Sequence, residues 1–267
     1  MRSLVNGQIN AEISRQDRGL HYGDGLFETM AIVDGEIRHW SLHWQRFIDG
    51  CQRLFLPEPN EMQILSEIDH VCSATGKEIV KLIYTRGVTE RGYAFDNVEP
   101  TRIISAFSWP NRSVNNPTLG VKIKICQTNL AIQPVLAGIK HLNRLENVLA
   151  RREWRDEYAE GLLCDTNGLI ISGTMSNVFY VKGGVLFTPD VSQCGVDGVM
   201  RRHIIQVAEE EKISVNVVSV DLQDLQDADE IFLCNSVIGI WPVSQMEDKI
   251  FEKDSFSMAR RLQHKIN

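Results

Sequence analysis

Lys140 is the residue in this sequence whose surroundings most favour covalent chemistry. It lies in the segment 136–143, LAGIKHLN, in which apolar residues dominate. Desolvation disfavours the charged ammonium form, so a lysine in such a run can serve as an amine nucleophile or form a Schiff base. A lysine that packs its methylene stem along apolar residues and keeps its charge in water is the commoner alternative. The segment alone leaves both readings open.

A glycine turn that opens a helix is the second candidate, for the binding of an anion. Residues 195–202 read GVDGVMRR and lead into a helical pattern. Backbone N–H groups at the start of a helix can point at a bound anion, and glycine allows the ligand to approach closely. Helix starts are common and bound anions are few, so an ordinary strand-to-helix turn is the alternative.

The motifs of several other enzyme classes are absent. The sequence has no phosphate-binding loop of the G-x-x-x-x-G-K-[ST] type and no G-x-S-x-G nucleophile motif. Gly23-Asp24-Gly25 starts a G-x-G pattern, but Glu28 occupies the position of its last glycine, which disfavours a dinucleotide site. The six cysteines form no C-x-x-C pair, so we expect free thiols and no metal site.

Six short segments along the whole chain carry a common pattern. In chain order they are RGLHYGDGLFET at 18–29, HWQR at 43–46, GIKHLNRLEN at 138–147, TMSNVF at 174–179, GVMR at 198–201 and CNS at 234–236. Together they resemble the fold-type IV family of pyridoxal 5'-phosphate (PLP) enzymes, which is the branched-chain-aminotransferase-like and D-amino-acid-aminotransferase-like family. The string at 138–147 most resembles the 4-amino-4-deoxychorismate lyase branch of that family.

This resemblance assigns roles to cofactor-binding residues. It implies that Lys140 forms the Schiff base with PLP and later moves protons. It also implies that Arg46, the backbone of Val199 and Met200, and the Ser236 hydroxyl bind the phosphate. Helical periodicity alone would place Arg46 opposite the apolar stripe of its helix, on a solvated face. A phosphate group with about −1.5 to −2 charges suits such a set of donors.

The implied reaction is an elimination that converts 4-amino-4-deoxychorismate to 4-aminobenzoate and pyruvate, a step of folate biosynthesis. This substrate carries two carboxylates, so local positive charge is expected in an acidic protein. Arg91, with Arg86 close by in the sequence, is the candidate, although exposed arginines are common on loops. Phe27 and Thr29 share one face of a strand that lines the pocket in relatives, and they could equally belong to a hairpin core.

Ser172 departs from the family pattern. The segment 171–177 reads ISGTMSN, and the family usually has Glu where Ser172 stands, facing the pyridine nitrogen. A serine hydroxyl can form a hydrogen bond there but carries no charge. We therefore expect Ser172 to contact the cofactor and to favour elimination over transamination. A weakened or repurposed enzyme is the alternative.

The pattern of apolar and turn residues predicts the elements that position these candidates. Residues 1–108 are expected to form a small α+β domain, with hairpins turned at Asn6-Gly7 and Asp34-Gly35, a helix capped by Ser41, and a second helix over 60–75. Residues 109–120 are the expected linker. Residues 121–267 are the expected larger domain, with the PLP lysine, a helix over about 143–158, further hairpins, a helix over 195–212 and a closing helix over 253–265. The fold class is therefore mixed α+β and α/β, with two domains.

Composition limits the possible partners. The 267 residues include 28 Lys+Arg and 35 Asp+Glu, for a net charge of −7, which argues against nucleic acid and anionic membranes. The first residues lack the apolar core of a signal peptide, so a cytoplasmic enzyme with a small-molecule substrate is expected. The resemblance implies a homodimer. An aminotransferase for D-amino or branched-chain acids and a non-catalytic PLP-binding homologue remain the alternative functions.

Overall fold

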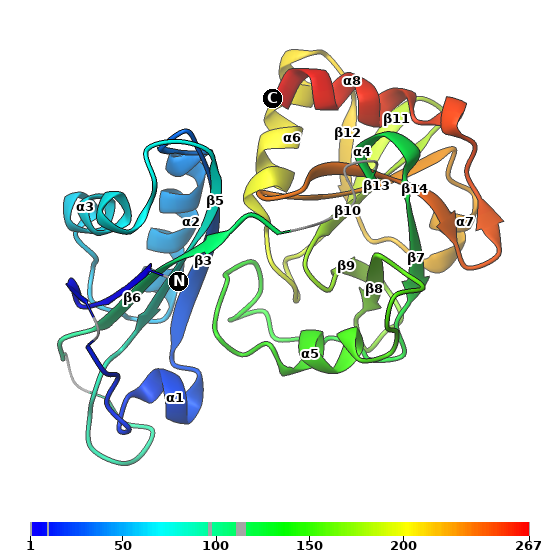
Figure 1. The fold of residues 1–267 in the computed structure, drawn as a ribbon. Helices are drawn as coiled ribbons and strands as arrows, with labels where there is room; N and C mark the ends of the chain where they lie inside the picture. The colour runs from blue at the N-terminus through cyan, green and yellow to red at the C-terminus, as the bar shows by residue number, and fades with distance from the viewer. Residues whose placement is uncertain (1, 10, 96–97, 111–115, 267) are drawn as a thin grey trace. The chain divides into compact units, whose positions relative to one another are not determined.

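The computed structural model describes residues 2–9, 11–95, 98–110 and 116–266. The chain divides into two compact units (Figure 1). Unit 1 comprises residues 1–111 together with 139–143, and unit 2 comprises residues 112–138 and 144–267. The segment with Lys140 therefore belongs by its contacts to unit 1, whereas the sequence assigned it to the C-terminal domain. Of the expected linker 109–120, residues 111–115 lie outside the described residues and Asn116–Leu119 form helix α4.

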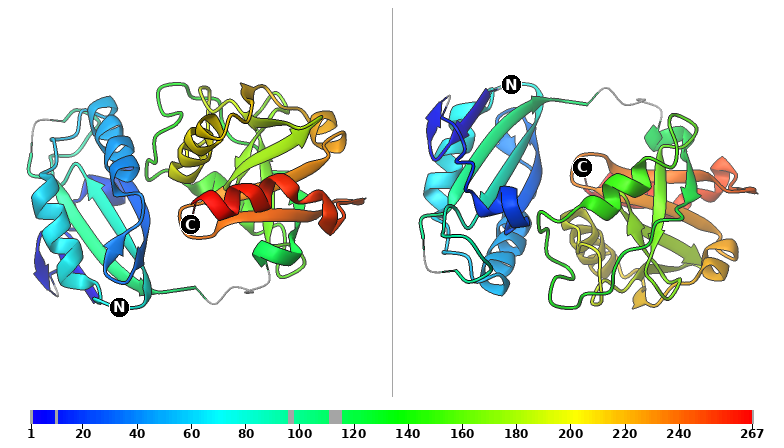
Figure 2. Two further views of the ribbon diagram at one scale, coloured as in Figure 1. Left: turned by 90° about the horizontal axis from the view of Figure 1, so that it is seen from above. Right: turned by 90° about the horizontal axis from the view of Figure 1, so that it is seen from below.

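Unit 1 is a six-stranded antiparallel sheet with two helices on one face (Figure 2). The strand order is β2-β1-β6-β5-β3-β4. Its elements are β1 (Arg2–Val5), β2 (Gln8–Ile9), α1 (Arg18–Tyr22), β3 (Gly25–Val33), β4 (Glu36–Ile37), α2 (Trp40–Arg53), α3 (Glu61–Val71), β5 (Lys77–Thr85) and β6 (Thr101–Ser108).

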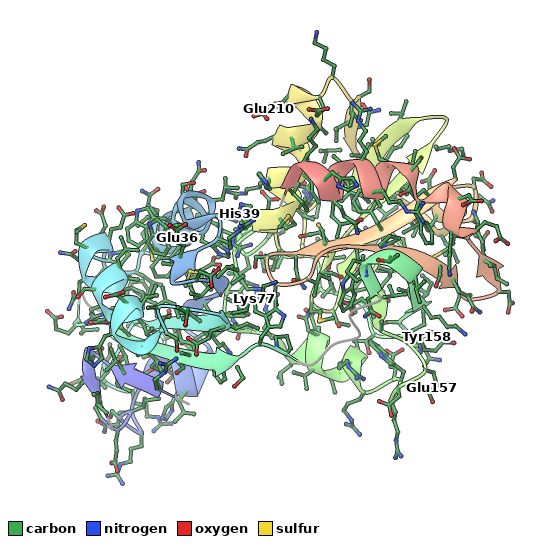
Figure 3. The ribbon with its side chains drawn as sticks, turned by 45° about the horizontal axis from the view of Figure 1, so that its top comes forward. Glu36, His39, Lys77, Glu157, Tyr158 and Glu210 are labelled. Atoms are coloured by element: carbon green, nitrogen blue, oxygen red, sulfur yellow. The ribbon has the colours of Figure 1, made fainter. Side chains whose placement is uncertain are left out.

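Both predicted hairpins of unit 1 are confirmed. Asn6 and Gly7 have φ values of 50° and 79°, and Asp34 and Gly35 have values of 50° and 82°. Positive φ at both central residues is the geometry that matches the twist of the paired strands. The predicted cap Ser41 is wrong, because α2 begins at Trp40. The residue before the helix is His39, which has a left-handed backbone and is labelled in Figure 3.

The alternation of side chains along β3 separates two environments. Leu26, Met30 and Ile32 lie on the face of β3 that contacts α2 and are almost fully buried. Phe27 and Thr29 lie on the opposite face of the strand and are half-buried. Adjacent residues of a strand point to opposite faces, so β3 supplies the core with one set and the outer face of the sheet with the other.

Unit 2 contains a nine-stranded mixed sheet with helices outside it. Eight strands run in the order β12-β11-β10-β13-β14-β7-β8-β9, and β15 pairs with β14. The elements are β7 (Val121–Ile125), α5 (Leu145–Arg151), β8 (Glu160–Cys164), β9 (Ile170–Gly173), β10 (Asn177–Lys182), β11 (Val185–Pro189), α6 (Val199–Glu210), β12 (Val215–Val218), α7 (Leu222–Gln226), β13 (Glu230–Asn235), β14 (Gly239–Met246), β15 (Lys249–Ile250), a 3-10 turn (Lys253–Ser255) and α8 (Ser257–Ile266).

The central strands of unit 2 are buried on both faces. Phe179 and Phe232 stack with ring centroids 5.1 Å apart and pack against α6 and α8. The intervening residues, such as Val178 and Leu233, pack into a second core with Ile123. Strand β9 also contacts β10, so the sheet curls back on itself. A sheet with two buried faces gives the continuous apolar runs seen at 178–181 and 231–234.

Helix α5 is much shorter than the predicted helix over 143–158, because the residues on either side of it have other partners. His141 pairs with Leu26 in unit 1. After the helix, the Glu153 carboxylate accepts backbone N–H groups of Gln127 and Thr128. None of the described helices is long and apolar enough to cross a membrane.

Candidate active site

Lys140 is positioned by strand-like pairing with the N-terminal half of β3. Its carbonyl accepts the Phe27 N–H at 2.9 Å, and the Leu142 N–H donates to the Gly25 carbonyl at 3.0 Å. Strand β4 pairs only with Ile32 and Val33, so this half of β3 has an edge that residues 140–142 occupy. The pairing explains why the lysine segment belongs to unit 1.

Gly25 is required for this arrangement. A Cβ atom at position 25 would lie 2.4 Å from the Tyr84 carbonyl oxygen, on the neighbouring strand β5. It would also lie 3.0 Å from the Leu142 side chain, on the lysine segment. Strand β3 can therefore lie between β5 and the lysine segment only if residue 25 is a glycine, which has no side chain.

The Phe27 ring lies beside two lysine ammonium groups. The Nζ atoms of Lys140 and Lys81 are 4.4 and 5.1 Å from its ring centroid. Lys81 pairs in register with Thr29, so the two candidate substrate residues and both lysines share the outer face of the sheet. Each cation–π contact of this kind stabilises by about 0.5–2 kcal/mol.

Arg46 is buried in unit 1, contrary to what helical periodicity suggests. It is 4% exposed, and its Nε donates to Glu28 Oε1 at 2.8 Å. Its Nη2 donates to Glu28 Oε2, so the contact is bidentate. Helix α2 thus buries two faces, one through apolar residues such as Phe47 and one through this ion pair.

His43 completes a buried cluster with Glu28 and Arg46. Burial alone would raise the pKa of Glu28, but Arg46 and His43 outweigh it and lower that pKa to about 2. The ionised carboxylate accepts, so His43 donates from Nδ1, at 2.7 Å. Burial lowers the pKa of His43, despite the opposing effect of Glu28. Its Nε2 is therefore an acceptor, and it has no hydrogen-bond partner among the described residues.

In unit 2, the residues around the start of α6 are held by Asn177. Its side chain donates to the Val196 carbonyl at 2.9 Å, and a Cβ at Gly198 would lie 2.0 Å from its Oδ1. Gly198 is the N-cap of α6 and supplies no side-chain hydrogen bond to the first turn, in which Val199 and Met200 lie. The start of this twelve-residue helix is therefore a place where backbone donors gather.

Ser236 lies in the turn after β13. The Asn235 carboxamide shapes this turn, because its oxygen accepts the N–H groups of Val237 and Ile238 at 2.9 and 2.8 Å. Its nitrogen donates to the Met175 carbonyl, which ties the turn to the segment after β9. The position of Ser236 therefore depends on a side chain for which the sequence suggested no role.

Ser172 is buried on β9, where its hydroxyl donates to the Gly173 carbonyl at 3.0 Å. The nearby carboxylate of Glu160 is fully buried and accepts from Met175 N–H and from the Ser176 hydroxyl. It also accepts from the backbone and side chain of Thr174. The Glu160 carboxylate is therefore hydrogen-bonded to residues 174–176. It does not take the place of the glutamate that is expected from the family pattern at position 172.

The two arginines that follow β5 differ sharply. Arg86 is 3% exposed and donates to Asp24 and to the Leu54 and Phe55 carbonyls, so it is neither solvated nor available to a ligand. Arg91 is exposed. Within the described residues, no group of three potential ligands lies close enough to hold a metal ion.

Sequence reasoning assigned no role to Glu28, His43, Glu160 or Asn177. Glu28 and His43 stand within the segments that carried the resemblance, yet only the pairing of α2 with β3 brings their side chains together. A buried acidic residue in an otherwise apolar strand, LFETMAIV, was the one available signal, because such a residue usually has a charged partner.

We expect Glu28→Gln to lower the free energy of unfolding at pH 7 by about 3–5 kcal/mol, because Arg46 would keep a buried charge without its partner. The carboxylate stabilises the folded state fully above the ordinary pKa of 4.5 and loses this effect as pH falls toward about 2. The difference between wild type and variant should therefore shrink over that range in urea titrations. Glu12→Gln, at an exposed position, is the control. A difference that does not change with pH would contradict this account.

Comparison with known proteins identifies the family of the chain. The family model for class IV amino-transferases matches residues 25–246. The chain is 38% identical to an aminodeoxychorismate lyase of Vibrio harveyi, with 98% of each chain covered. It is 31% identical to a putative branched-chain-amino-acid aminotransferase of Methanocaldococcus jannaschii, over 100% of this chain and 95% of the relative.

A solved structure extends the likeness to three dimensions. The 4-amino-4-deoxychorismate lyase of Pseudomonas aeruginosa is 42% identical, with a TM-score of 0.94 over 99% of this chain and 97% of that one. The fold-type IV architecture expected from the sequence is confirmed by this match. The chain belongs to the class IV aminotransferase family.

Proposed function

We propose that this protein is a PLP-dependent lyase that converts 4-amino-4-deoxychorismate to 4-aminobenzoate and pyruvate. The observation that carries the proposal is the likeness, over nearly the full length, to lyases at 38% and 42% identity. The 31% identical relative named as a putative branched-chain aminotransferase makes transamination the second candidate.

The donor chemistry of this chain fits PLP. A phosphate group needs fixed cationic and N–H donors. The buried guanidinium of Arg46, the uncapped start of α6 at Val199 and Met200, and the Ser236 hydroxyl are donors of that kind. We propose that these donors bind the phosphate and that Lys140 bonds covalently to the cofactor.

When bound, PLP supplies an electron sink for negative charge that develops at the substrate carbon bearing nitrogen. Lys140 Nζ would remove the proton from that carbon, which carries no hydrogen in 4-aminobenzoate, as the neighbouring carbon–oxygen bond to the enolpyruvyl group breaks. The same amine would then give a proton to the departing enolpyruvate, which leaves as pyruvate, so that Lys140 acts as general base and then as general acid. The pairing of residues 140–142 with β3 fixes the backbone from which this amine extends. Arg91 binds a substrate carboxylate, while Phe27 and Thr29 line the face on which Lys140 acts.

We also propose a cytoplasmic homodimer. Helix α5 exposes an apolar stripe, with Leu145, Val148 and Leu149 at 76%, 55% and 51% exposure. Contiguous exposed apolar side chains at i, i+3 and i+4 are typical of a protein interface. All six cysteines are free thiols, which supports a reducing compartment.

The direct test incubates the PLP-loaded protein with 4-amino-4-deoxychorismate and measures 4-aminobenzoate and pyruvate. We expect both products in equal amounts, and we expect Lys140→Ala to abolish turnover because it removes the covalent attachment and the proton carrier. Borohydride should fix the cofactor on Lys140, detected by peptide mass. Cofactor binding without either product would contradict the lyase function, and a fully active Lys140→Ala would contradict the role of the lysine.

Arg46→Ala should weaken PLP binding by about 2–5 kcal/mol, because it removes one side of a buried charge pair. Ser236→Ala should cost about 1 kcal/mol, the value of one hydrogen bond. Both are measured by equilibrium titration of the apoprotein with PLP. Arg53→Ala, on an exposed part of the same helix, is the control for Arg46. Wild-type affinity in Arg46→Ala would remove Arg46 from the proposed phosphate site.

Ser172→Glu should increase side transamination, measured as pyridoxamine phosphate formed with amino acids. A carboxylate at position 172 would hold a proton on the ring nitrogen, whereas the serine hydroxyl has no charge to do so. Transamination depends more on that charge, because elimination is also driven by aromatisation of the product. Ser172→Gln is the uncharged control of similar size. An unchanged ratio of the two reactions in Ser172→Glu would show that Ser172 has no electronic role.

A further inference from the structure

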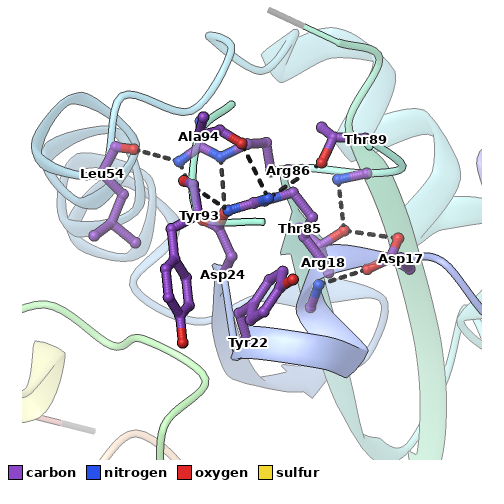
Figure 4. Close-up of polar contacts among 12 residues, drawn as sticks. Asp17, Arg18, Tyr22, Asp24, Leu54, Thr85, Arg86, Thr89, Tyr93 and Ala94 are labelled. Carbon is purple, nitrogen blue, oxygen red and sulfur yellow. Dashed lines mark hydrogen bonds and ion pairs between the residues drawn. The ribbon is translucent and has the colours of Figure 1, made fainter. Parts of the chain in front are cut away.

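Three charged side chains meet at one end of the unit 1 sheet, outside the contacts described for Lys140 and Arg46. Asp24 accepts from Arg18 Nε and Arg86 Nε, both at 2.8 Å to Oδ2 (Figure 4). Arg86 Nη2 also donates to Oδ1 at 3.0 Å. Arg18 and Arg86 are 4% and 3% exposed. We call these three residues the Asp24 cluster.

Arg18 uses its remaining donors on the segment 88–95, which follows β5. Its Nη1 donates to the Thr89 hydroxyl at 3.1 Å and to the Gly92 carbonyl at 2.8 Å. Its guanidinium also lies 4.8 Å from the ring centroid of Tyr22, whose hydroxyl accepts the Gly92 N–H. The middle of the segment is therefore wrapped around one guanidinium, as Figure 4 shows.

The end of the segment is held by Arg86. The Arg86 guanidinium lies 3.7 Å from the ring centroid of Phe95. Its Nη1 and Nη2 donate to the Phe55 and Leu54 carbonyls, each at 2.7 Å, at the C-terminal end of α2. Asp24 thus joins the start of β3, the end of α2 and the 88–95 segment through two arginines.

The segment itself has little apolar burial to fix its conformation. Tyr93 is 86% exposed, Phe95 is 44% exposed, and Arg91 is exposed. Ordering each residue of a loop costs about 1–2 kcal/mol, which must be offset by specific contacts. In this segment those contacts are mainly hydrogen bonds and ring contacts to Arg18, Tyr22 and Arg86. Charge-assisted hydrogen bonds of this kind are the stronger ones.

We propose that Arg18 is a positioning residue for substrate recognition, which fixes the 88–95 segment so that Arg91 can bind a substrate carboxylate. The proposal rests on the proposed lyase function. This role requires the planar guanidinium of arginine, because Arg18 donates at the same time to three acceptors in different directions. They are the Asp24 carboxylate, the Thr89 hydroxyl and the Gly92 carbonyl. Lysine keeps the charge, but its three N–H donors diverge from one nitrogen, which cannot lie within hydrogen-bond distance of acceptors that contact Nε and Nη1 separately.

The test compares Arg18→Lys with wild-type holoenzyme by three measurements. Amide hydrogen exchange of the peptide that spans 88–95 should become at least about tenfold faster, since charge-assisted hydrogen bonds are lost. The KM for 4-amino-4-deoxychorismate should rise by about tenfold or more, while kcat stays within about twofold. The Kd for PLP should not change, which separates this effect from damage to the fold or to the phosphate site.

Arg91→Gln is the matched control. It should raise KM in the same way but leave hydrogen exchange of the segment unchanged, because it removes the carboxylate ligand without releasing the loop. In the double variant the effects on KM should not add. An Arg18→Lys protein with faster exchange and unchanged KM would overturn the proposal, as would one with unchanged exchange. A wild-type protein without lyase activity would instead overturn the proposed function and, with it, the link to substrate.

Discussion

The pairing of residues 140–142 with the open half of β3 is the contact on which the proposed chemistry depends. It gives Lys140 a backbone position set by pairing with a strand of the sheet, and it requires β4 to be short. Strand β3 also carries Glu28 on its other face and Phe27 beside the lysine. One strand therefore links the Lys140 segment, the ion pair of Arg46 and the outer face of the sheet.

The candidate residues of the two units, each unit taken by itself, offer different kinds of group. In unit 1 they are side-chain groups, namely the Lys140 amine, the Arg46 guanidinium and the acceptor nitrogen of His43. In unit 2 they are backbone groups and hydroxyls, which carry no formal charge. Their positions depend on hydrogen bonds to the carboxamides of Asn177 and Asn235 and to the Glu160 carboxylate. Sites built on strands and helices keep their geometry better than sites on loops. The 88–95 segment, which carries Arg91, is the exception because it is a loop. The arginines of the Asp24 cluster fix its conformation through hydrogen bonds and a ring contact.

The two turn signals in unit 1 were reliable because the conformation of a tight turn depends on its own residues. The Asn6-Gly7 and Asp34-Gly35 turns need only two residues with positive φ, so they could be read directly. Arg46 could not, because its burial depends on a carboxylate eighteen residues earlier in the chain, on another element. The same holds for residues 139–143, whose place in unit 1 is set by an unpaired strand edge. The roles of Arg46 and Lys140 came from resemblance and remain predictions.

The ion pair of Glu28 and Arg46 has a consequence for how the protein is made. A guanidinium buried for a phosphate ligand would carry an unbalanced charge whenever that ligand was missing, and the helix that bears it would be hard to fold. Glu28 supplies the balancing charge from within the same unit. Unit 1 can therefore fold with the charge of Arg46 already balanced, before any ligand is bound.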